Sequence, residues 1–169
     1  ALVRRLVAHL EIPIVLDAEG LNGFRGRVRL LKDHRLPLVL TPHREEFERL
    51  FGEKWPEGLR RRAALAKRLS AFYDGVLVLK GRRTLVVQRD RVYVNRTGNP
   101  GMAKGGSGDV LAGILAAFIA QGLGVFDAAV WAVYFHGRAG DLAVREKGEL
   151  GLVAGDLIDY LPKAFRRRV

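Results

Sequence analysis

Five glycines fall between residues 97 and 108, directly ahead of a strongly apolar helical pattern. Glycines have no Cβ to block a close approach, so successive backbone N–H groups can turn toward one oxyanion at the start of a helix. The spacing therefore predicts a phosphate-binding turn, which is made by Gly105, Gly106, Ser107 and Gly108.

Asp109 follows this turn immediately. A carboxylate repels the phosphate that the glycine amides attract, so its position requires a different partner. A hydroxyl is such a partner, because a carboxylate within hydrogen-bond reach accepts its proton while the amides stabilise a moving phosphoryl group. The alternative is that Asp109 only caps the helix N-terminus, and the residue taken by itself favours the cap.

The elements that must position this turn alternate between strands and helices. Short apolar runs bounded by Pro, Gly or Asp predict buried strands at 14–16, 37–41 and 75–80, and the runs at 84–88 and 92–94 predict a hairpin. Helices are expected over the following ranges: 2–10, 45–51, 59–73, 109–120, 127–145 and 156–165. The pattern predicts an α/β layered domain with a largely parallel sheet.

Two of these helices carry specific expectations about burial. The 109–120 segment is apolar nearly all round, which predicts a central buried helix. The 59–73 segment places Leu59, Ala63, Ala66, Leu69 and Phe72 on its apolar side. Pro162 is expected to kink the last helix.

Composition limits the partners. Lys and Arg number 29 against 18 Asp and Glu, a net charge of +11, but the basic clusters are scattered and no basic stripe is interleaved with aromatic residues. We therefore expect anionic small molecules and no nucleic acid. The chain has no cysteine, which suits a reducing compartment, and no apolar run of the roughly 20 residues that span a membrane.

Five segments, in order along the chain, resemble the ribokinase-like superfamily and, within it, the ADP- or ATP-dependent NAD(P)H-hydrate dehydratases. The most specific one is the run TGNPGMA at 97–103 with GGSGD at 105–109, preceded by Asn95. The other four read VLDAEGLN at 15–22, LTPHREEF at 40–47, LKGRRTLV at 79–86 and FHGRAGDLA at 135–143. The resemblance implies a ribokinase-like three-layer α/β/α fold with a mostly parallel central sheet, forming a single domain over residues 1–169. It also implies that roughly the first third of the family domain lies outside this sequence.

The resemblance further implies roles for individual residues. Asp109 becomes the catalytic base that contacts the hydrated substrate, and His43 a second substrate contact, although a histidine at a strand end is more often structural. Nucleotide binding is assigned to Lys80, Gly81, Arg82, Arg83 and Thr84, and to Gly105, Gly106, Ser107 and Gly108. Glu46 is expected to organise Mg²⁺ through water, unless Glu45 and Glu46 are exposed acids that only favour the helix dipole. Helix packing is the expected role of His136 and Asp141.

The implied reaction is the repair of NADHX or NADPHX, the hydrated forms of NADH and NADPH. The hydrate hydroxyl is phosphorylated by ADP or ATP, with ADP preferred, and phosphate is then eliminated. The resemblance also implies a cytoplasmic homotetramer and fusion or association with an NAD(P)HX epimerase domain. Two alternatives stay open: a ribokinase-like kinase of the hydroxymethylpyrimidine or hydroxyethylthiazole type, and a non-catalytic nucleotide-binding remnant.

Overall fold

A computed structural model describes residues 2–166 and contains one five-stranded sheet in the order β1-β2-β3-β4-β5. The strands β1 (Ile14–Leu16), β2 (Leu38–Leu40) and β3 (Val76–Leu79) run parallel to one another. The hairpin of β4 (Leu85–Gln88) and β5 (Arg91–Val94) continues the sheet in antiparallel fashion. The sheet is thus parallel in its first three strands, whose carboxyl ends share one edge.

Alternation along the strands gives the sheet two buried faces. In β2 and β3 the leucines face one core and the valines the other, because successive side chains of a strand point to opposite faces. The register continues the leucine row across the sheet, from Leu16 through Leu40 and Leu77 to Val87. Both faces therefore need helices to cover them.

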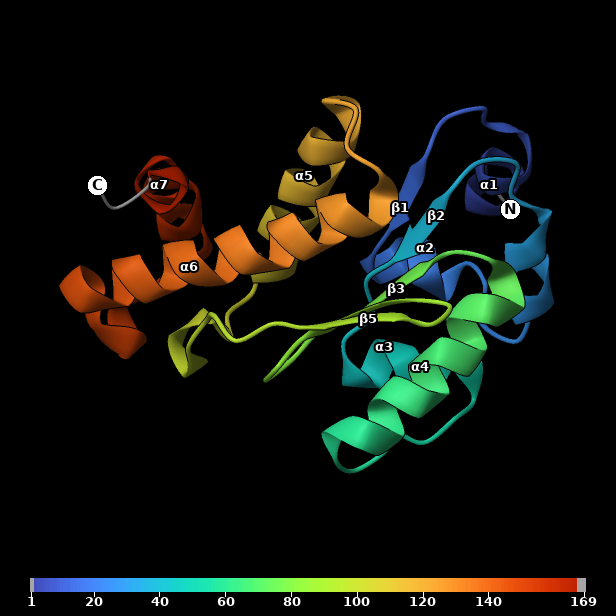
Figure 1. Ribbon diagram of the computed structural model, residues 1–169, viewed down its shortest axis with the longest axis horizontal. Coiled ribbons are helices and arrows are strands. Elements are labelled where there is room, and N and C mark those ends of the chain that lie inside the picture. The colour runs from blue at the N-terminus through green and yellow to red at the C-terminus, as the bar shows by residue number, and fades with distance from the viewer. Residues whose placement is uncertain (1, 167–169) are drawn as a thin grey trace.

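Helices cover both faces, as Figure 1 shows. The leucine face packs against the following elements: α1 (Leu2–His9), α2 (Ala18–Asn22), the 3-10 turn η1 (Val28–Asp33), α3 (Arg44–Phe51) and α4 (Leu59–Tyr73). The valine face packs against α5 (Ser107–Ala120) and α6 (Val125–Gly151). A third cluster joins α6 to α7 (Ala154–Phe165) and reaches Met102 of the short turn η2 (Pro100–Met102). The expected three-layer α/β/α arrangement is confirmed.

Two expectations about burial, for β1 and for α4, are wrong in detail. Ile14 and Val15 are only half-buried, because β1 is an edge strand of the sheet within residues 2–166. On α4, Tyr73 rather than Phe72 enters the core; Phe72 is exposed and lies under the Lys32 ammonium.

Helix α5 is also less enclosed than its composition indicated. Leu111, Ile114 and Leu115 are buried on the valine face, whereas Gly113 and Ala117 are exposed. Small apolar residues fill the outer face, so the apolar pattern did not report burial all round the helix. In the part of the chain that the structure describes, no helix combines the length and the apolar character needed to cross a bilayer.

Candidate active site

The glycine turn is exposed and ends at the N-terminus of α5. Gly106 is the N-cap residue, with φ of 86°, a left-handed conformation that favours glycine. The backbone N–H groups of Gly105, Gly106, Gly108 and Asp109 donate to no acceptor within residues 2–166. The buried hydroxyl of Ser107 likewise has no hydrogen-bond partner there. These donors, together with the positive end of the α5 dipole, suit a bound anion.

Asp109 is the third residue of α5, and its side chain is exposed beside the turn. No hydrogen bond within residues 2–166 involves its carboxylate, and the α5 N-terminus has no side-chain cap. The carboxylate is therefore available to a ligand rather than used as a cap.

Lys80 links the glycine turn to the carboxyl ends of the parallel strands. Its Nζ lies 2.5 Å from Asp17 Oδ1 and 3.5 Å from Glu46 Oε2, and all three side chains are largely buried. Both Nζ and Asp17 Oδ2 border Gly108, at 3.3 and 3.5 Å from the position that a Cβ would occupy there. Because Asp17 follows β1 and Lys80 follows β3, the parallel strands gather these charges at their carboxyl edge, where open α/β sheets bind ligands.

His43 and Glu46 form a reciprocal cap at the start of α3. His43 Nδ1 accepts from the N–H groups of Glu45 and Glu46, and Glu46 Oε2 accepts from the His43 N–H at 2.8 Å. The expectation that Glu46 could be an exposed first-turn acid is wrong, because its exposed fraction is 7%; only Glu45 is exposed. The histidine ring remains 45% exposed, with Nε2 at 3.2 Å from Glu46 Oε1.

The surroundings of Glu46 limit how a metal could be held. Both carboxylate oxygens already face donors of this chain, on His43 and Lys80. Within residues 2–166 no three His, Cys, Asp or Glu side chains are arranged as metal ligands. The donor set fits Mg²⁺ that is held mainly by phosphate oxygens and water, with a carboxylate in the outer shell, and does not fit an all-protein cage.

Residues 81–84 form a tight turn between β3 and β4. The Thr84 hydroxyl donates to Gly81 O at 2.9 Å and accepts from the Gly81 N–H at 3.3 Å. Gly81 and Arg83 both have positive φ, and Arg82 and Arg83 are exposed. Within the predicted 80–84 nucleotide segment, Lys80 lies next to Gly108 of the glycine turn.

The TGNPGMA loop docks into a notch on α6, made by Gly137 and Gly140. A Cβ on Gly137 would overlap Thr97, and one on Gly140 would overlap the Met102 side chain. Asp141 accepts from the Gly98 N–H at 2.9 Å and from Asn99 Nδ2 at 3.1 Å. The segments 97–103 and 135–143 are thus two halves of one contact, and Asp141 has the packing role that was expected.

Beneath the turn, His136 of α6 lies 3.0 Å from the Ser107 carbonyl through Nε2. Burial lowers the pKa of His136 from 6.5 to about 4; the Ser107 hydrogen bond opposes this shift and the nearby Lys80 charge adds to it. The ring is therefore neutral at neutral pH, and its Nε2–H donates to the carbonyl. His136 supports the first residue of α5.

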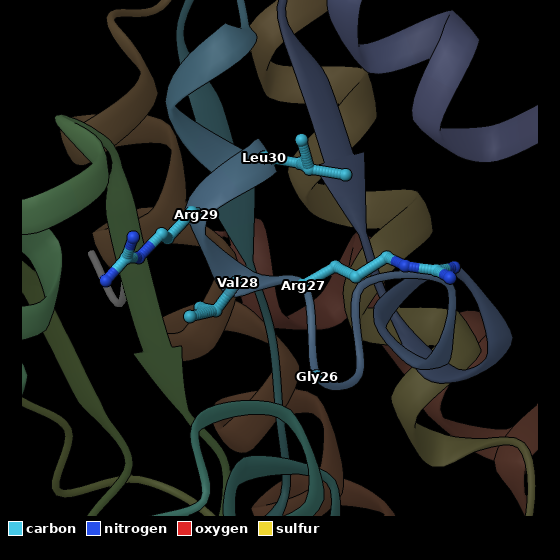
Figure 2. A pocket seen from close by; sticks show the side chains of 5 residues that line it. All are labelled: Gly26, Arg27, Val28, Arg29 and Leu30. Carbon is cyan, nitrogen blue, oxygen red and sulfur yellow. The ribbon is translucent and has the colours of Figure 1, made fainter.

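One surface hollow lies elsewhere and carries no chemistry. It has a volume of about 460 Å³ and is lined by residues 26–30. Figure 2 shows that the side chains of Arg27 and Arg29 point in opposite directions from this segment. Polar groups therefore do not converge there, as a ligand site requires.

Asp17 is the site residue that reasoning from the sequence missed. It stands in the VLDAEGLN segment, directly after the first strand, and a carboxylate in that position was a sufficient signal. The His-x-x-Glu spacing of residues 43–46 was a second signal, because a capping box has the same spacing.

Known proteins resemble this chain over most of its length. The Carb_kinase family model, described as NAD(P)H-hydrate dehydratase, matches residues 2–163. The chain is 44% identical over 166 residues to the bifunctional NAD(P)H-hydrate repair enzyme Nnr of Moorella thermoacetica, covering 98% of this chain and 31% of that protein. It is 40% identical over 156 residues to the ADP-dependent (S)-NAD(P)H-hydrate dehydratase of Neisseria meningitidis, covering 90% and 53%. The chain thus spans about a third to a half of the length of these relatives.

Solved structures give the same result. The ADP/ATP-dependent NAD(P)H-hydrate dehydratase of Bacillus subtilis, co-crystallised with ATP and Mg²⁺, matches with a TM-score of 0.75 and 34% identity, covering 90% of this chain and 54% of that one. Ribokinase of Thermotoga maritima matches with a TM-score of 0.58 at 15% identity, covering 94% and 52%, a likeness of fold alone. The expected ribokinase-like fold is confirmed, and the chain belongs to the NAD(P)H-hydrate dehydratase family.

Proposed function

We propose that this chain carries the ADP-dependent dehydration of NADHX and NADPHX to NADH and NADPH. One observation carries the proposal. At the start of α5, four backbone N–H groups that donate to no acceptor within residues 2–166 lie beside the exposed Asp109 carboxylate. The names of the Neisseria and Moorella relatives support this choice of substrate, and the Neisseria name supports ADP.

In the first step the hydrate hydroxyl attacks the terminal phosphorus of ADP. Asp109 accepts the hydroxyl proton, a new phosphorus–oxygen bond forms, and the bond from that phosphorus to the bridging oxygen breaks, so that AMP leaves. The open amides of Gly105, Gly106 and Gly108 bind the moving phosphoryl group, where oriented donors stabilise the developing charge.

In the second step the phosphorylated hydrate loses inorganic phosphate. The carbon–oxygen bond breaks, and the neighbouring ring carbon loses a proton to water, which restores the double bond. Phosphorylation makes this elimination possible because phosphate is a far better leaving group than hydroxide.

We assign the remaining contacts as follows. Lys80 binds the nucleotide phosphates, and Gly81, Arg82, Arg83 and Thr84 complete the nucleotide-binding segment. The exposed edge of His43 contacts the hydrated dinucleotide. When bound, Mg²⁺ neutralises phosphate charge; Glu46 would hold it through water, in keeping with the engaged state of both its oxygens.

The proposal extends to the state of the enzyme. We expect residues 1–169 to belong to a single ribokinase-like domain of a cytoplasmic homotetramer, fused to or associated with an NAD(P)HX epimerase domain. The bifunctional name of the Moorella relative supports the last point, and the absence of cysteine suits a reducing compartment.

The test is an assay with NADH hydrate, ADP and Mg²⁺ that follows the recovery of NADH absorbance. Recovery that depends on ADP supports dehydration. Accumulation of a phosphorylated product without NADH would indicate a simple kinase, and ADP binding without turnover would indicate a non-catalytic remnant.

A further inference from the structure

Helix α6 contacts the backbone of the glycine turn through one side chain. Nε2 of His136 lies 3.0 Å from the Ser107 carbonyl, which belongs to the first residue of α5. Within residues 2–166 no other side chain hydrogen-bonds to the backbone of residues 105–109. The Ser107 N–H donates to another backbone group, the Lys104 carbonyl, at 3.3 Å. His136 is therefore the side chain that can orient this backbone.

The carbonyl that His136 binds is part of the same peptide group as the Gly108 N–H. The peptide group is trans and planar, so its C=O and its N–H point in opposite directions. The direction of the Ser107 carbonyl therefore sets the direction of the Gly108 N–H, which donates to no acceptor within residues 2–166. A hydrogen bond to the carbonyl also polarises the peptide group, which makes its N–H a stronger donor.

The His136 ring donates this hydrogen bond without carrying a charge. Burial lowers the pKa of His136 to about 4, so the ring is neutral at neutral pH. A neutral imidazole has one N–H, and the carbonyl acceptor keeps that proton on Nε2. The nearby Lys80 ammonium also disfavours protonation of the ring. A neutral donor thus orients the turn without repelling Lys80.

The helix that carries His136 is itself held against the loop that leads into the turn. The next residue, Gly137, lies so close to Thr97 that a Cβ there would overlap it. One turn further along α6, Asp141 accepts from the Gly98 N–H at 2.9 Å. A side chain on a helix that is fixed in this way holds its partner more precisely than one on a loop.

We propose that His136 is a positioning residue of the anion site, which orients the Ser107–Gly108 peptide group so that the Gly108 N–H points at the phosphoryl group in transfer. The inference rests on the proposed function for the identity of that anion. The ring touches no reacting atom and acts through the peptide group. Oriented donors matter most where charge develops in the transition state, so the loss of His136 should lower kcat more than nucleotide affinity.

The test compares His136→Leu with His136→Gln. Leucine removes the N–H donor, whereas the glutamine amide keeps one at a similar distance from the backbone. We expect His136→Leu to lower kcat for NADH recovery at least about tenfold and to raise the dissociation constant for ADP less than about threefold. His136→Gln should restore most of kcat. The value of kcat is expressed per ADP-binding site counted by calorimetry, so that unfolded molecules do not enter it.

Arg138→Leu is the matched control. Arg138 lies on the same helix, and its Nε donates to the Ala164 carbonyl of α7 at 2.9 Å, a bond of the same kind to a different element. Its removal should leave kcat within about twofold. A kcat of His136→Leu that equals that of Arg138→Leu would overturn the proposal, and so would equal losses in His136→Leu and His136→Gln.

Nuclear magnetic resonance of the unmodified chain decides the question if His136→Leu does not fold. The probe is ADP without Mg²⁺ and without NADH hydrate, so that no turnover occurs. The Nε2–H of His136 and the Gly108 N–H are joined through one peptide group, and we expect both resonances to shift along the same titration curve. A shift of the Gly108 resonance alone would overturn the positioning role. A Gly108 resonance that does not move would overturn the anion site as well.

This inference and the proposed reaction fail in different ways. A protein that regenerates no NADH, but in which ADP shifts both resonances together, would retain the positioning role and lose the dehydratase assignment. Normal kcat in folded His136→Leu would retain the dehydratase assignment and remove the positioning role.

Discussion

Lys80 Nζ lies 2.5 Å from Asp17 Oδ1, and this ion pair lies next to Gly108 of the glycine turn. The pair is largely buried, and Glu46 adds a second carboxylate on the same ammonium. The ammonium therefore separates two carboxylates, and it also provides positive charge next to Gly108. Under the proposed function, Lys80 therefore both stabilises the carboxyl ends of the strands and binds the nucleotide.

Lys80→Met is expected to lower the free energy of unfolding by about 3 to 5 kcal/mol, because it leaves two carboxylates buried without a counterion. Asp17→Asn should cost less, since Glu46 still pairs with the lysine. Urea denaturation of both single variants and of the double variant measures the coupling. Additive losses would show that the ion pair contributes no stability of its own.

Asp109→Asn is expected to reduce the rate of NADH recovery at least about a hundredfold, the low end of general-base catalysis. Stability should not change, because the carboxylate is exposed and makes no hydrogen bond within residues 2–166. Asp159→Asn, at an exposed acid of α7, is the matched control. Near-full turnover of Asp109→Asn would contradict its role as the base.

Gly137→Ala is expected to destabilise the fold by about 2 to 3 kcal/mol, because the added methyl group overlaps both the side chain and the backbone of Thr97. Gly113→Ala is the control, since a Cβ there meets nothing within 4 Å. That change in the interior of α5 should raise stability by about 0.5 to 1 kcal/mol. Thermal unfolding measures both, and equal effects would rule out the notch as the cause.

Stability is expected to depend on pH through His136. Its pKa is about 4 in the folded protein and 6.5 when unfolded, because burial disfavours the charged ring. Between pH 4 and 6.5 the unfolded chain binds more protons at His136 than the folded protein does. The stability that depends on the neutral ring is therefore complete above pH 6.5 and is lost as the pH falls toward 4. The loss is on the order of 3 kcal/mol.

Urea denaturation between pH 4.5 and 7 tests this for the unmodified chain and for His136→Gln, which should show a flatter dependence. His9→Gln, at an exposed histidine, should leave the dependence unchanged. Identical slopes in all three proteins would exclude His136 as the titrating group.

The sequence predicted the elements well where local pattern decides them. The helix at 59–73 and the strand at 14–16 have the bounds that were expected, because hydrophobic periodicity and the flanking Gly and Pro residues are local properties of the sequence. The helix at 18–22 and the 3-10 turn at 28–33 were missed, since such short elements repeat their pattern too few times to be recognised.

Burial was harder to predict because it depends on neighbours. A position at the edge of the sheet exposes part of β1, and α5 turns its small residues outward. Within the site, the spacing of the glycines predicted a turn at the start of a helix with Asp109 beside it, and the structure has both at the start of α5. Their roles in binding and catalysis stay predictions. The pairing of Asp17 with Lys80 could not be predicted, because those residues are 63 positions apart and meet only when the parallel strands align.

The notch on α6 has a consequence for evolution and engineering. His136, Gly137 and Asp141 lie on one helix and contact three different parts of the loop and the turn. Helix α6 alone therefore sets the position of the 97–109 segment at three points. Exchange of this loop between relatives should therefore succeed only when α6 is exchanged with it.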